Sequence, residues 1–349
     1  MEKTPIITIA GRKVGPEYPP LVIVEIGINH GGSMAKAKRM IRDAAEAGAE
    51  CVKFQAHVVE DEMVPIAKKI IPGHAKKSIW DIMKKCAFSE KEDRKLKRYV
   101  EKLGMIYLST PFSRAGADRL LRMSVKAYKI GSGECNNYPL VEHVARFRKP
   151  VILSTGMNDI ASVSRSVAIL RKHHVPFALL NCTSMYPTPY DKVRLGALAD
   201  LRKAFPDAVI GQSDHSIGNY SCFGATALGA SILERHFTSD KKWPGPDIAI
   251  SMDSKELKDL ITGSRAIWQA RGGAKVILKE EKDIIKFAYA CVVSITSVKK
   301  GERFTKQNIW VKRPGTGEIK ALDYAKLLGK RATRDIPADV QLKRRDIAR

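Results

Sequence analysis

The chain has 349 residues, of which 44% are hydrophobic, and its 61 basic and 37 acidic residues give a formal net charge of +24. This composition supports a sizeable core and argues against disorder. No apolar run reaches the length of about 18 residues that a membrane span needs, and the first residues lack a signal-peptide core. We therefore expect a cytoplasmic protein with no membrane partner.

The positive charge by itself is compatible with nucleic-acid binding. The basic residues are scattered, however, few aromatic residues lie among them, and no helix-turn-helix, zinc-finger or RNA-recognition signature is present. A basic nucleic-acid-binding protein is therefore the weaker hypothesis. A solvated basic surface, or a field that attracts a small anionic substrate, explains the charge better. The six cysteines form no C-x-x-C pair, which favours reduced core thiols over disulfides.

Apolar segments of strand length alternate with segments of helical period along the first 270 residues. The expected strands are Leu21–Ile26, Cys51–Gln55, Met105–Ser109, Ala127–Ile130, Val151–Leu153, Phe177–Asn181, Val209–Gly211 and Ala230–Glu234. The expected helices are one capped by Ser33 and ended by Gly48, one from Ser89 through Leu103, then Ser113–Arg122, Tyr138–Phe147, Ala161–Arg171, Leu195–Phe205, a small-residue helix before Ala230, and Ser254–Arg271. A long insertion, His57 to Cys86, follows the second strand.

Strands that are apolar along their whole length belong in a parallel sheet covered on both faces. About eight such strands, each followed by a helix, predict an α/β protein with a (β/α)8 TIM barrel over residues 1–272. An open doubly wound sheet is the alternative. The G-x-G-x-x-G fingerprint and the P-loop are both absent, which disfavours it.

Polar side chains gather where these apolar strands end, and in a TIM barrel those ends form the active site. The residues at these ends are Glu25, Lys53, Gln55, Thr110, Lys129, Ser132, Glu134, Ser154, Asn181, Ser184, Ser213, His215, Glu234 and His236. Two lysines among several hydroxyl groups suit a small anion that carries phosphate or carboxylate. His215 and His236 follow strands that should be neighbours, which favours a divalent-metal pair; the alternative is that each imidazole only caps its strand.

The character of the chain changes after Gly272-Gly273. Residues 273–286 are charged and linker-like, and residues 287–349 predict a small β-rich domain with strands Ala288–Ser294 and Ile309–Lys312. Arg313 precedes a Pro-Gly turn. It is either an ordinary solvated arginine or an arm that reaches into a pocket, including a pocket of a neighbouring chain.

Ten motifs together resemble the sialic acid synthase (N-acetylneuraminate synthase) family, over nearly the whole chain. They are EIGINHGGS from Glu25, KFQ from Lys53, STPFS from Ser109, KIGSGECNNYPL from Lys129, ILSTGM from Ile152, CTSMYPTPY from Cys182, GQSDHS from Gly211, LERHFT from Leu233, PGPD from Pro244 and VKRPGTG from Val311. The C-terminal segment resembles the antifreeze-protein-like (SAF) domain of these enzymes.

The resemblance implies an enzyme that condenses phosphoenolpyruvate with N-acetylmannosamine and water to give N-acetylneuraminate and phosphate, with cleavage of a C–O bond. It also implies a divalent cofactor, commonly Mn²⁺, and a homodimer in which the SAF domain of one chain covers the barrel mouth of the other. Alternatives within the family are N-acetylmannosamine 6-phosphate and the precursors of legionaminic or pseudaminic acid. The Lys241-Lys242 loop could favour a phosphorylated sugar.

The resemblance also assigns roles to individual residues. It gives catalytic roles to Glu134, His215, His236, Lys53 and Lys129, with His215 and His236 as the metal ligands. It gives phosphoenolpyruvate binding to the two lysines with Thr110, Ser132, Ser154, Ser184 and Ser213, and sugar contacts to Glu25, Gln55, Tyr186 and Asp247. Arg313, with Phe287 near it, would come from the partner chain. Ser184 and Phe54 depart from the asparagine and histidine of some relatives.

Overall fold

The computed structural model describes residues 4–73 and 77–348, and the chain divides into two compact units, Met1–Gly272 and Gly273–Arg349. The first unit holds an eight-stranded parallel sheet over its described residues, in the order β5-β4-β3-β10-β9-β8-β7-β6. Its strands are β3 (Leu21–Gly27), β4 (Cys51–Ala56), β5 (Ile106–Pro111), β6 (Tyr128–Ile130), β7 (Val151–Ser154), β8 (Phe177–Cys182), β9 (Val209–Asp214) and β10 (Ile232–His236). The two outermost strands of this order, β5 and β6, contact each other and close the ring.

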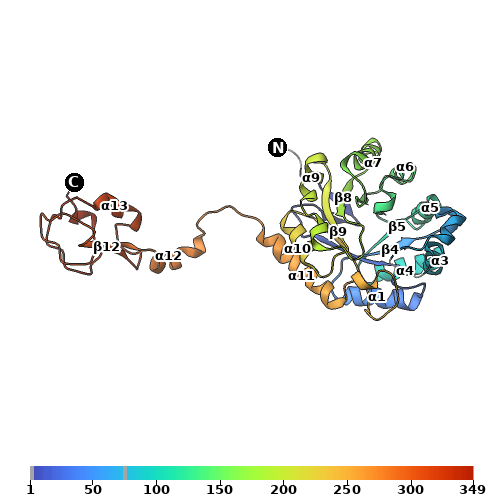
Figure 1. Cartoon of the computed structure of the whole chain (residues 1–349), viewed down its shortest axis with the longest axis horizontal. Coiled ribbons are helices and arrows are strands. Elements are labelled where there is room, and N and C mark those ends of the chain that lie inside the picture. Colours follow the sequence, from blue (N-terminus) through green and yellow to red (C-terminus); the bar gives the residue numbers. More distant parts are fainter. Residues whose placement is uncertain (1–3, 74–76, 349) are drawn as a thin grey trace. The chain divides into compact units, whose positions relative to one another are not determined.

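Helices surround this ring on its outer side (Figure 1). They are α1 (Met34–Glu46), α4 (Glu90–Lys102), α5 (Arg114–Arg122), α6 (Tyr138–Ala145), α7 (Ile160–Lys172), α9 (Ala197–Ala204), α10 (Tyr220–Ala227) and α11 (Ser254–Ala270), with the short α8 (Tyr190–Val193) before α9. The expected caps are present: the Ser33 hydroxyl accepts from the Lys36 amide, and Ser89 forms a capping box with Glu92. The (β/α)8 prediction is confirmed.

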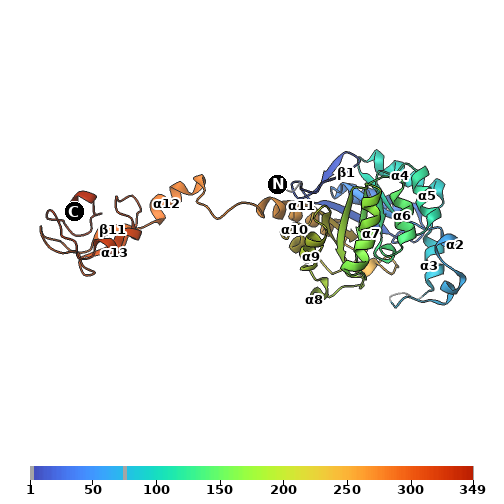
Figure 2. The same cartoon turned by 90° about the horizontal axis from the view of Figure 1, so that it is seen from above.

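A short hairpin that the sequence analysis missed closes the amino end of the barrel (Figure 2). It pairs β1 (Ile7–Ile9) with β2 (Arg12–Val14), and its buried Ile7, Ile9 and Val14 join an apolar cluster with the strand starts Leu21 and Cys51. Strands of three residues carry too little pattern to be recognised locally. Because this end is plugged, the carboxyl end of the strands is the one available for a ligand.

The insertion after β4 is itself structured. It contains α2 (Val59–Glu62), a 3-10 turn (Pro65–Lys69) and α3 (Ile79–Cys86). Each barrel strand differs from its expected range by at least one residue at one end. In β9 the strand runs on to Asp214, and β10 covers Ile232–His236 instead of Ala230–Glu234. The chain turns at Gly229, whose φ of +93° suits glycine, so the last strand starts later and His236 lies within it.

The second unit has its own apolar core around Val292, Phe304 and Ile309. Its strands β11 (Cys291–Ser294) and β12 (Ile309–Lys312) pair antiparallel, and α13 (Tyr324–Leu327) follows them. The strand expected from Ala288 starts only at Cys291, and the stretch expected to be linker-like contains helical turns. A 3-10 turn (Lys279–Glu281) and α12 (Lys282–Ala288) occupy that stretch, because its isoleucines and charged residues also fit a short helix.

All six cysteines are buried and free. Within the described residues, no helix is both long and apolar enough to span a membrane.

Candidate active site

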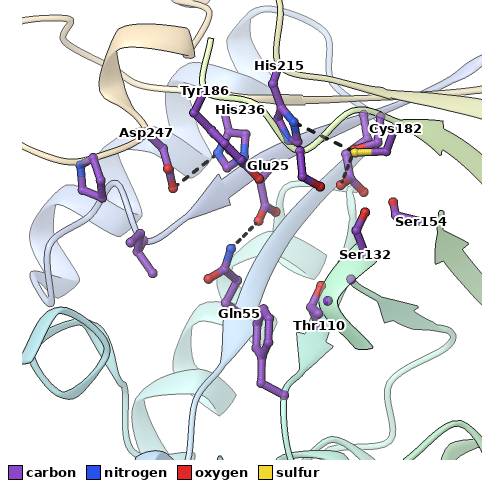
Figure 3. Close-up of a pocket in the computed structure, with 18 of the residues that line it drawn as sticks. Glu25, Gln55, Thr110, Ser132, Ser154, Cys182, Tyr186, His215, His236 and Asp247 are labelled. Atoms are coloured by element: carbon purple, nitrogen blue, oxygen red, sulfur yellow. Dashed lines mark hydrogen bonds and ion pairs between the residues drawn. The ribbon is translucent and has the colours of Figure 1, made fainter. Parts of the chain in front are cut away.

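A cavity of about 450 Å³ opens at the carboxyl ends of the barrel strands (Figure 3). Fourteen of the sequence-predicted site residues line it. They are Glu25, Lys53, Gln55, Thr110, Lys129, Ser132, Ser154, Ser184, Tyr186, Ser213, His215, Glu234, His236 and Asp247. They come from different strands and meet because parallel strands present their carboxyl ends at one rim.

Two buried lysines lie at the floor of the cavity, each with an acidic partner. Lys53 Nζ is 2.8 Å from Glu25 Oε2 and 3.7 Å from Glu234 Oε1, and Lys129 Nζ is 3.4 Å from Glu234 Oε1. Burial lowers the pKa of Lys129. Burial acts in the same direction on Lys53, but the nearby Glu234 and Glu25 carboxylates outweigh it and raise the pKa of Lys53. The carboxylates therefore favour the charged form of Lys53, whereas at Lys129 the effect of burial is larger than that of Glu234.

Hydroxyl groups complete this end of the cavity. Lys53 Nζ donates to Thr110 Oγ1 at 3.1 Å, and Lys129 Nζ donates to Ser154 Oγ at 2.7 Å. The Ser132 hydroxyl accepts from the Gly156 amide at 3.0 Å. A Cβ on Gly156 would lie 2.6 Å from Ser184 Oγ, so only glycine allows these hydroxyls to approach. Ammonium and hydroxyl donors concentrated in this way match an anionic oxygen cluster.

The two histidines lie side by side, with ring centroids 5.4 Å apart (Figure 3). The ring of Tyr186 stacks on His215 at 4.1 Å. The Nδ1 atom of His215 lies 2.9 Å from the Thr183 carbonyl oxygen, so in the neutral imidazole Nδ1 is the donor and Nε2 is the lone-pair nitrogen. Burial lowers the pKa of His236 to about 4, so this imidazole is neutral at physiological pH.

These features fit two protein ligands of a divalent metal ion. A backbone carbonyl that orients one imidazole nitrogen is the usual support of a metal-binding histidine. His236 Nδ1 is buried without a hydrogen bond, and its nearest carboxylate oxygen, on Asp247, is 3.8 Å away. Between residues 4 and 348, leaving out the undescribed 74–76, no cluster of three or more histidine, cysteine or acidic side chains is arranged to hold a metal. The remaining coordination positions of a bound ion would therefore be occupied by water or by substrate oxygens.

Comparisons with known protein families and with individual proteins match almost the whole chain. The NeuB family matches residues 40–276, and the SAF domain matches residues 289–348. The N,N'-diacetyllegionaminic acid synthase of Campylobacter jejuni is 37% identical over 91% of this chain and 97% of its own length. The human N-acetylneuraminate-9-phosphate synthase is 33% identical over 94% of this chain and 93% of its own.

A solved structure agrees. The N-acetylneuraminic acid synthetase of Leptospira borgpetersenii, crystallised with citrate, superposes with a TM-score of 0.74 at 33% identity, over 81% of this chain and 95% of that one. This chain belongs to the NeuB family.

In this NeuB family member, part of the cavity wall could not be inferred from strand ends. Ile79, Ile82 and Met83 on α3 line it, and so do Ile28, Phe112 and Met157. Nothing in the sequence marks α3 as a wall, because its position depends on how the insertion folds over the rim. The sequence analysis also did not include Cys182 among the site residues. It ends β8 and its sulfur lies 4.0 Å from His215 Nδ1, so its place at a strand end could have revealed it.

Two predicted residues of the strand-end ring do not line the cavity. Asn181 turns outward, where its amide donates to Gln212 Oε1 at 3.0 Å. Glu134 follows Ser132 in a 3-10 turn (Ser132–Glu134) and accepts from Asn137 Nδ2 at 2.6 Å. This turn rotates the carboxylate away from the direction in which an extended strand end would point it. Burial still raises the pKa of Glu134.

The remaining predicted residues lie in the second unit. Phe287 is on α12 and is 56% exposed, while Arg313 is exposed just after β12. The peptide bond between Arg313 and Pro314 is cis, and Lys286 O accepts from the Gly315 amide at 2.8 Å. This bond joins the Arg313 turn to the end of α12, so both residues belong to one surface of the SAF domain.

Proposed function

We propose that this protein condenses phosphoenolpyruvate with N-acetylmannosamine and water, giving N-acetylneuraminate and phosphate. The observation that supports it best is the cluster of Lys53, Lys129 and serine or threonine hydroxyls beside the His215–His236 pair in one cavity. The names of the relatives, which are synthases of nonulosonic acids, support the reaction class.

In this proposal, the lysine end of the cavity holds phosphoenolpyruvate. The ammonium groups of Lys53 and Lys129 exchange some of their interaction with Glu25 and Glu234 for the anion, while Thr110, Ser132, Ser154, Ser184 and Ser213 supply hydrogen bonds. Charge-assisted contacts of this kind in a buried site are strong because little water competes with them. The enol carbon is then fixed facing the second substrate, which is the proximity contribution to the rate.

His215 and His236 would hold a divalent ion, and we propose Mn²⁺. Such an ion supplies Lewis acidity toward the sugar aldehyde. The protein's own groups on this side are Glu25, Gln55, Tyr186 and Asp247, which would orient the sugar. Glu134, the residue after the cavity-lining Ser132 and Gly133, is proposed to stabilise the positive charge that develops next to the phosphate oxygen, or to take the proton of the attacking water.

We propose further that a homodimer completes the site. Arg313 of the partner's SAF domain would contact the N-acyl group of the sugar, with Phe287 beside it. An exposed arginine suits this task, since its turn is hydrogen-bonded to the end of α12 and a guanidinium donates to carbonyl oxygens in a fixed geometry. Analytical sedimentation tests the oligomeric state directly.

A second candidate substrate is an uncharged diacetamido sugar, the precursor type of legionaminic acid. The observation that favours it is the apolar wall of Ile28, Ile79, Ile82, Met83 and Met157, which suits methyl groups better than hydroxyls. Among the described residues of this chain, the lining has no lysine or arginine other than the two floor lysines, which favours an uncharged sugar over a 6-phosphorylated one.

The test is phosphate release from phosphoenolpyruvate in the presence of Mn²⁺ and one sugar at a time. The sugars are N-acetylmannosamine, its 6-phosphate and the diacetamido compounds, with mass spectrometry of each product. Release with N-acetylmannosamine supports the primary proposal, and preference for a diacetamido sugar supports the second. A folded protein that releases no phosphate with any of them contradicts both.

A further inference from the structure

One buried histidine next to the cavity has no part in the function proposed above. His57 follows β4 directly and is only 2% exposed, yet it does not line the cavity. Its Nε2 atom lies 2.9 Å from Gln55 Oε1, and its Nδ1 atom lies 2.8 Å from Glu62 Oε2. Its ring stacks on Phe112 at 4.7 Å between centroids, with 12° between the planes. The imidazole is therefore held on both edges and on one face.

Gln55 in turn connects this histidine to the cavity. Its Nε2 atom donates to Glu25 Oε1 at 2.9 Å, as Figure 3 shows, and its side chain lines the cavity. The backbone beside it leaves little room, since a Cβ on Gly27 would lie 3.1 Å from Glu25 Oε1 and 3.3 Å from Gln55 Nε2. A continuous chain of hydrogen bonds thus runs from Glu62 through His57 and Gln55 to Glu25.

The Glu62 end of this chain of hydrogen bonds is also held in place. Glu62 ends α2, and its neighbour Asp61 accepts from the Ala115 amide at 2.8 Å, in the first turn of α5. The carboxylate of Glu62 therefore has a fixed place on the barrel, independent of any ligand. A histidine held against such an anchor cannot rotate without losing a buried hydrogen bond.

The donors and acceptors of this chain allow one orientation of the Gln55 amide. The amide nitrogen faces Glu25 Oε1 and the amide oxygen faces His57 Nε2, which matches a Glu25 that is ionised beside Lys53 and therefore only accepts. His57 Nε2 is then the donor to Gln55 Oε1, and Nδ1 is the ring nitrogen that meets Glu62 Oε2 at 2.8 Å. Turning the amide over would set its oxygen against the Glu25 carboxylate, which places two acceptors in contact in a buried site.

We propose that His57 is a positioning residue that locks the Gln55 amide so that Gln55 meets the sugar as a hydrogen-bond donor. Within the described residues, Gln55 Nε2 makes one hydrogen bond, to Glu25, which leaves its second hydrogen for the cavity. The matching group is an acceptor oxygen of the sugar, a hydroxyl or an N-acyl carbonyl. The inference rests on the proposed function to the extent that a sugar occupies this side of the cavity.

Steady-state kinetics of three variants at one position test it. His57→Phe keeps the ring on Phe112 but removes both hydrogen bonds, and we expect the sugar KM to rise about 10-fold, as for the loss of one good hydrogen bond. The phosphoenolpyruvate KM should stay within about 2-fold. His57→Gln places an amide where Nε2 was and should recover most of the sugar affinity, whereas His57→Asn places its amide at the Nδ1 position and should not.

A double-mutant cycle checks that the effect passes through Gln55. In a Gln55→Ala background, His57→Phe should change the sugar KM by less than about 2-fold, because the locked group is already gone. His143→Phe is the matched control, since His143 also faces a carboxylate, Asp118 at 2.7 Å, and a phenylalanine ring, Phe147, without contact to Gln55. Equal rises in both KM values, equal behaviour of the Gln and Asn variants, or additive effects in the cycle would overturn the proposal.

A measurement without turnover separates this inference from the proposed function. In protein labelled with ¹⁵N at its eight histidines, His57 should show a slowly exchanging, hydrogen-bonded proton at Nε2, identified by its loss in His57→Phe. Rapid exchange at His57 would refute the locked orientation even if the enzyme is active. A protected proton at Nε2 in a protein that condenses no sugar would instead leave the lock standing and refute the proposed function. Thermal unfolding of each variant shows that it is folded.

Discussion

Lys129 and Glu234 face each other inside the barrel, with 3.4 Å between Nζ and Oε1 and with both side chains under 10% exposed. Glu234 also lies 3.7 Å from Lys53 Nζ, so one carboxylate serves two ammonium groups. Removing one member of a buried ion pair leaves an uncompensated charge. In this site, the missing negative charge is one that a bound phosphate could replace.

Glu234→Gln should therefore lower the free energy of unfolding by about 3 kcal/mol, and phosphoenolpyruvate should recover more of it than it adds to the wild-type protein. Thermal unfolding with and without phosphoenolpyruvate measures both effects. Glu101→Gln, which removes the partner of Lys97 on the exposed face of α4, is the control and should change little. A smaller ligand-induced shift in Glu234→Gln than in wild type would contradict an anion site at the lysines.

His236→Ala should abolish turnover, by more than about 100-fold, while the fold persists, because it removes one of the two proposed metal ligands. Titration with Mn²⁺ followed by electron paramagnetic resonance should show weakened binding in the same variant. Full activity of the wild-type protein in buffer treated with a chelator would rule out the metal role.

Arg313→Ala should raise the sugar KM far more than the phosphoenolpyruvate KM, since the proposed contact is with the N-acyl group. Arg303→Ala removes another exposed arginine of the same domain and should leave both values unchanged. Equal effects of Arg313→Ala on the two substrates would argue against a sugar-contacting arm.

Mixing two impaired variants, assayed at a sugar concentration well below the KM of Arg313→Ala, tests whether that arm comes from the partner chain. Co-expressed His236→Ala and Arg313→Ala chains should form mixed dimers in which one site has both intact residues. Recovery of up to about a quarter of wild-type activity is then expected from random pairing. No recovery, in dimers shown to be mixed, would mean that each chain completes its own site.

His30 should make the stability of the barrel depend on pH. It is 2% exposed, stacks on Phe88 at 4.3 Å, and accepts at Nδ1 from the Gly32 amide. Burial lowers its pKa from 6.5 to about 4. Because the folded-state pKa is the lower one, the stabilising contribution is complete above pH 6.5 and is lost as the pH falls toward 4. The largest loss is about 3 kcal/mol.

His30→Asn keeps an acceptor for the Gly32 amide but does not titrate, so it isolates this contribution. Urea unfolding of both proteins at several pH values gives the difference in their pH slopes. Subtracting the two slopes cancels the contributions of titratable groups that both proteins share. One of these is Asp93, because burial raises its pKa to about 7 and its contribution to the pH dependence of stability therefore has the opposite sign. Parallel pH profiles of the two proteins would show that His30 does not contribute.

The barrel and most of its site could be predicted from the sequence because the relevant signals are local. Strands such as Leu21–Gly27 are apolar along their whole length, and caps such as Ser33 and Ser89 mark where helices begin. Once eight such units alternate, the connection rule for parallel strands brings all their carboxyl ends to one rim. That rule is why Lys53, Lys129, His215 and His236 were expected together.

The relationships that give the site its chemistry were decided by the tertiary structure. The pairing of Lys53 with Glu25 depends on the register of β3 and β4, which shifts between Glu25 and Gly27. The wall from α3 depends on how the insertion folds over the rim, and the outward turn of Asn181 depends on Gln212 in the next strand. Local pattern records which face of an element is apolar. Packing decides which polar atoms from distant parts of the sequence meet. No short stretch of sequence contains that information.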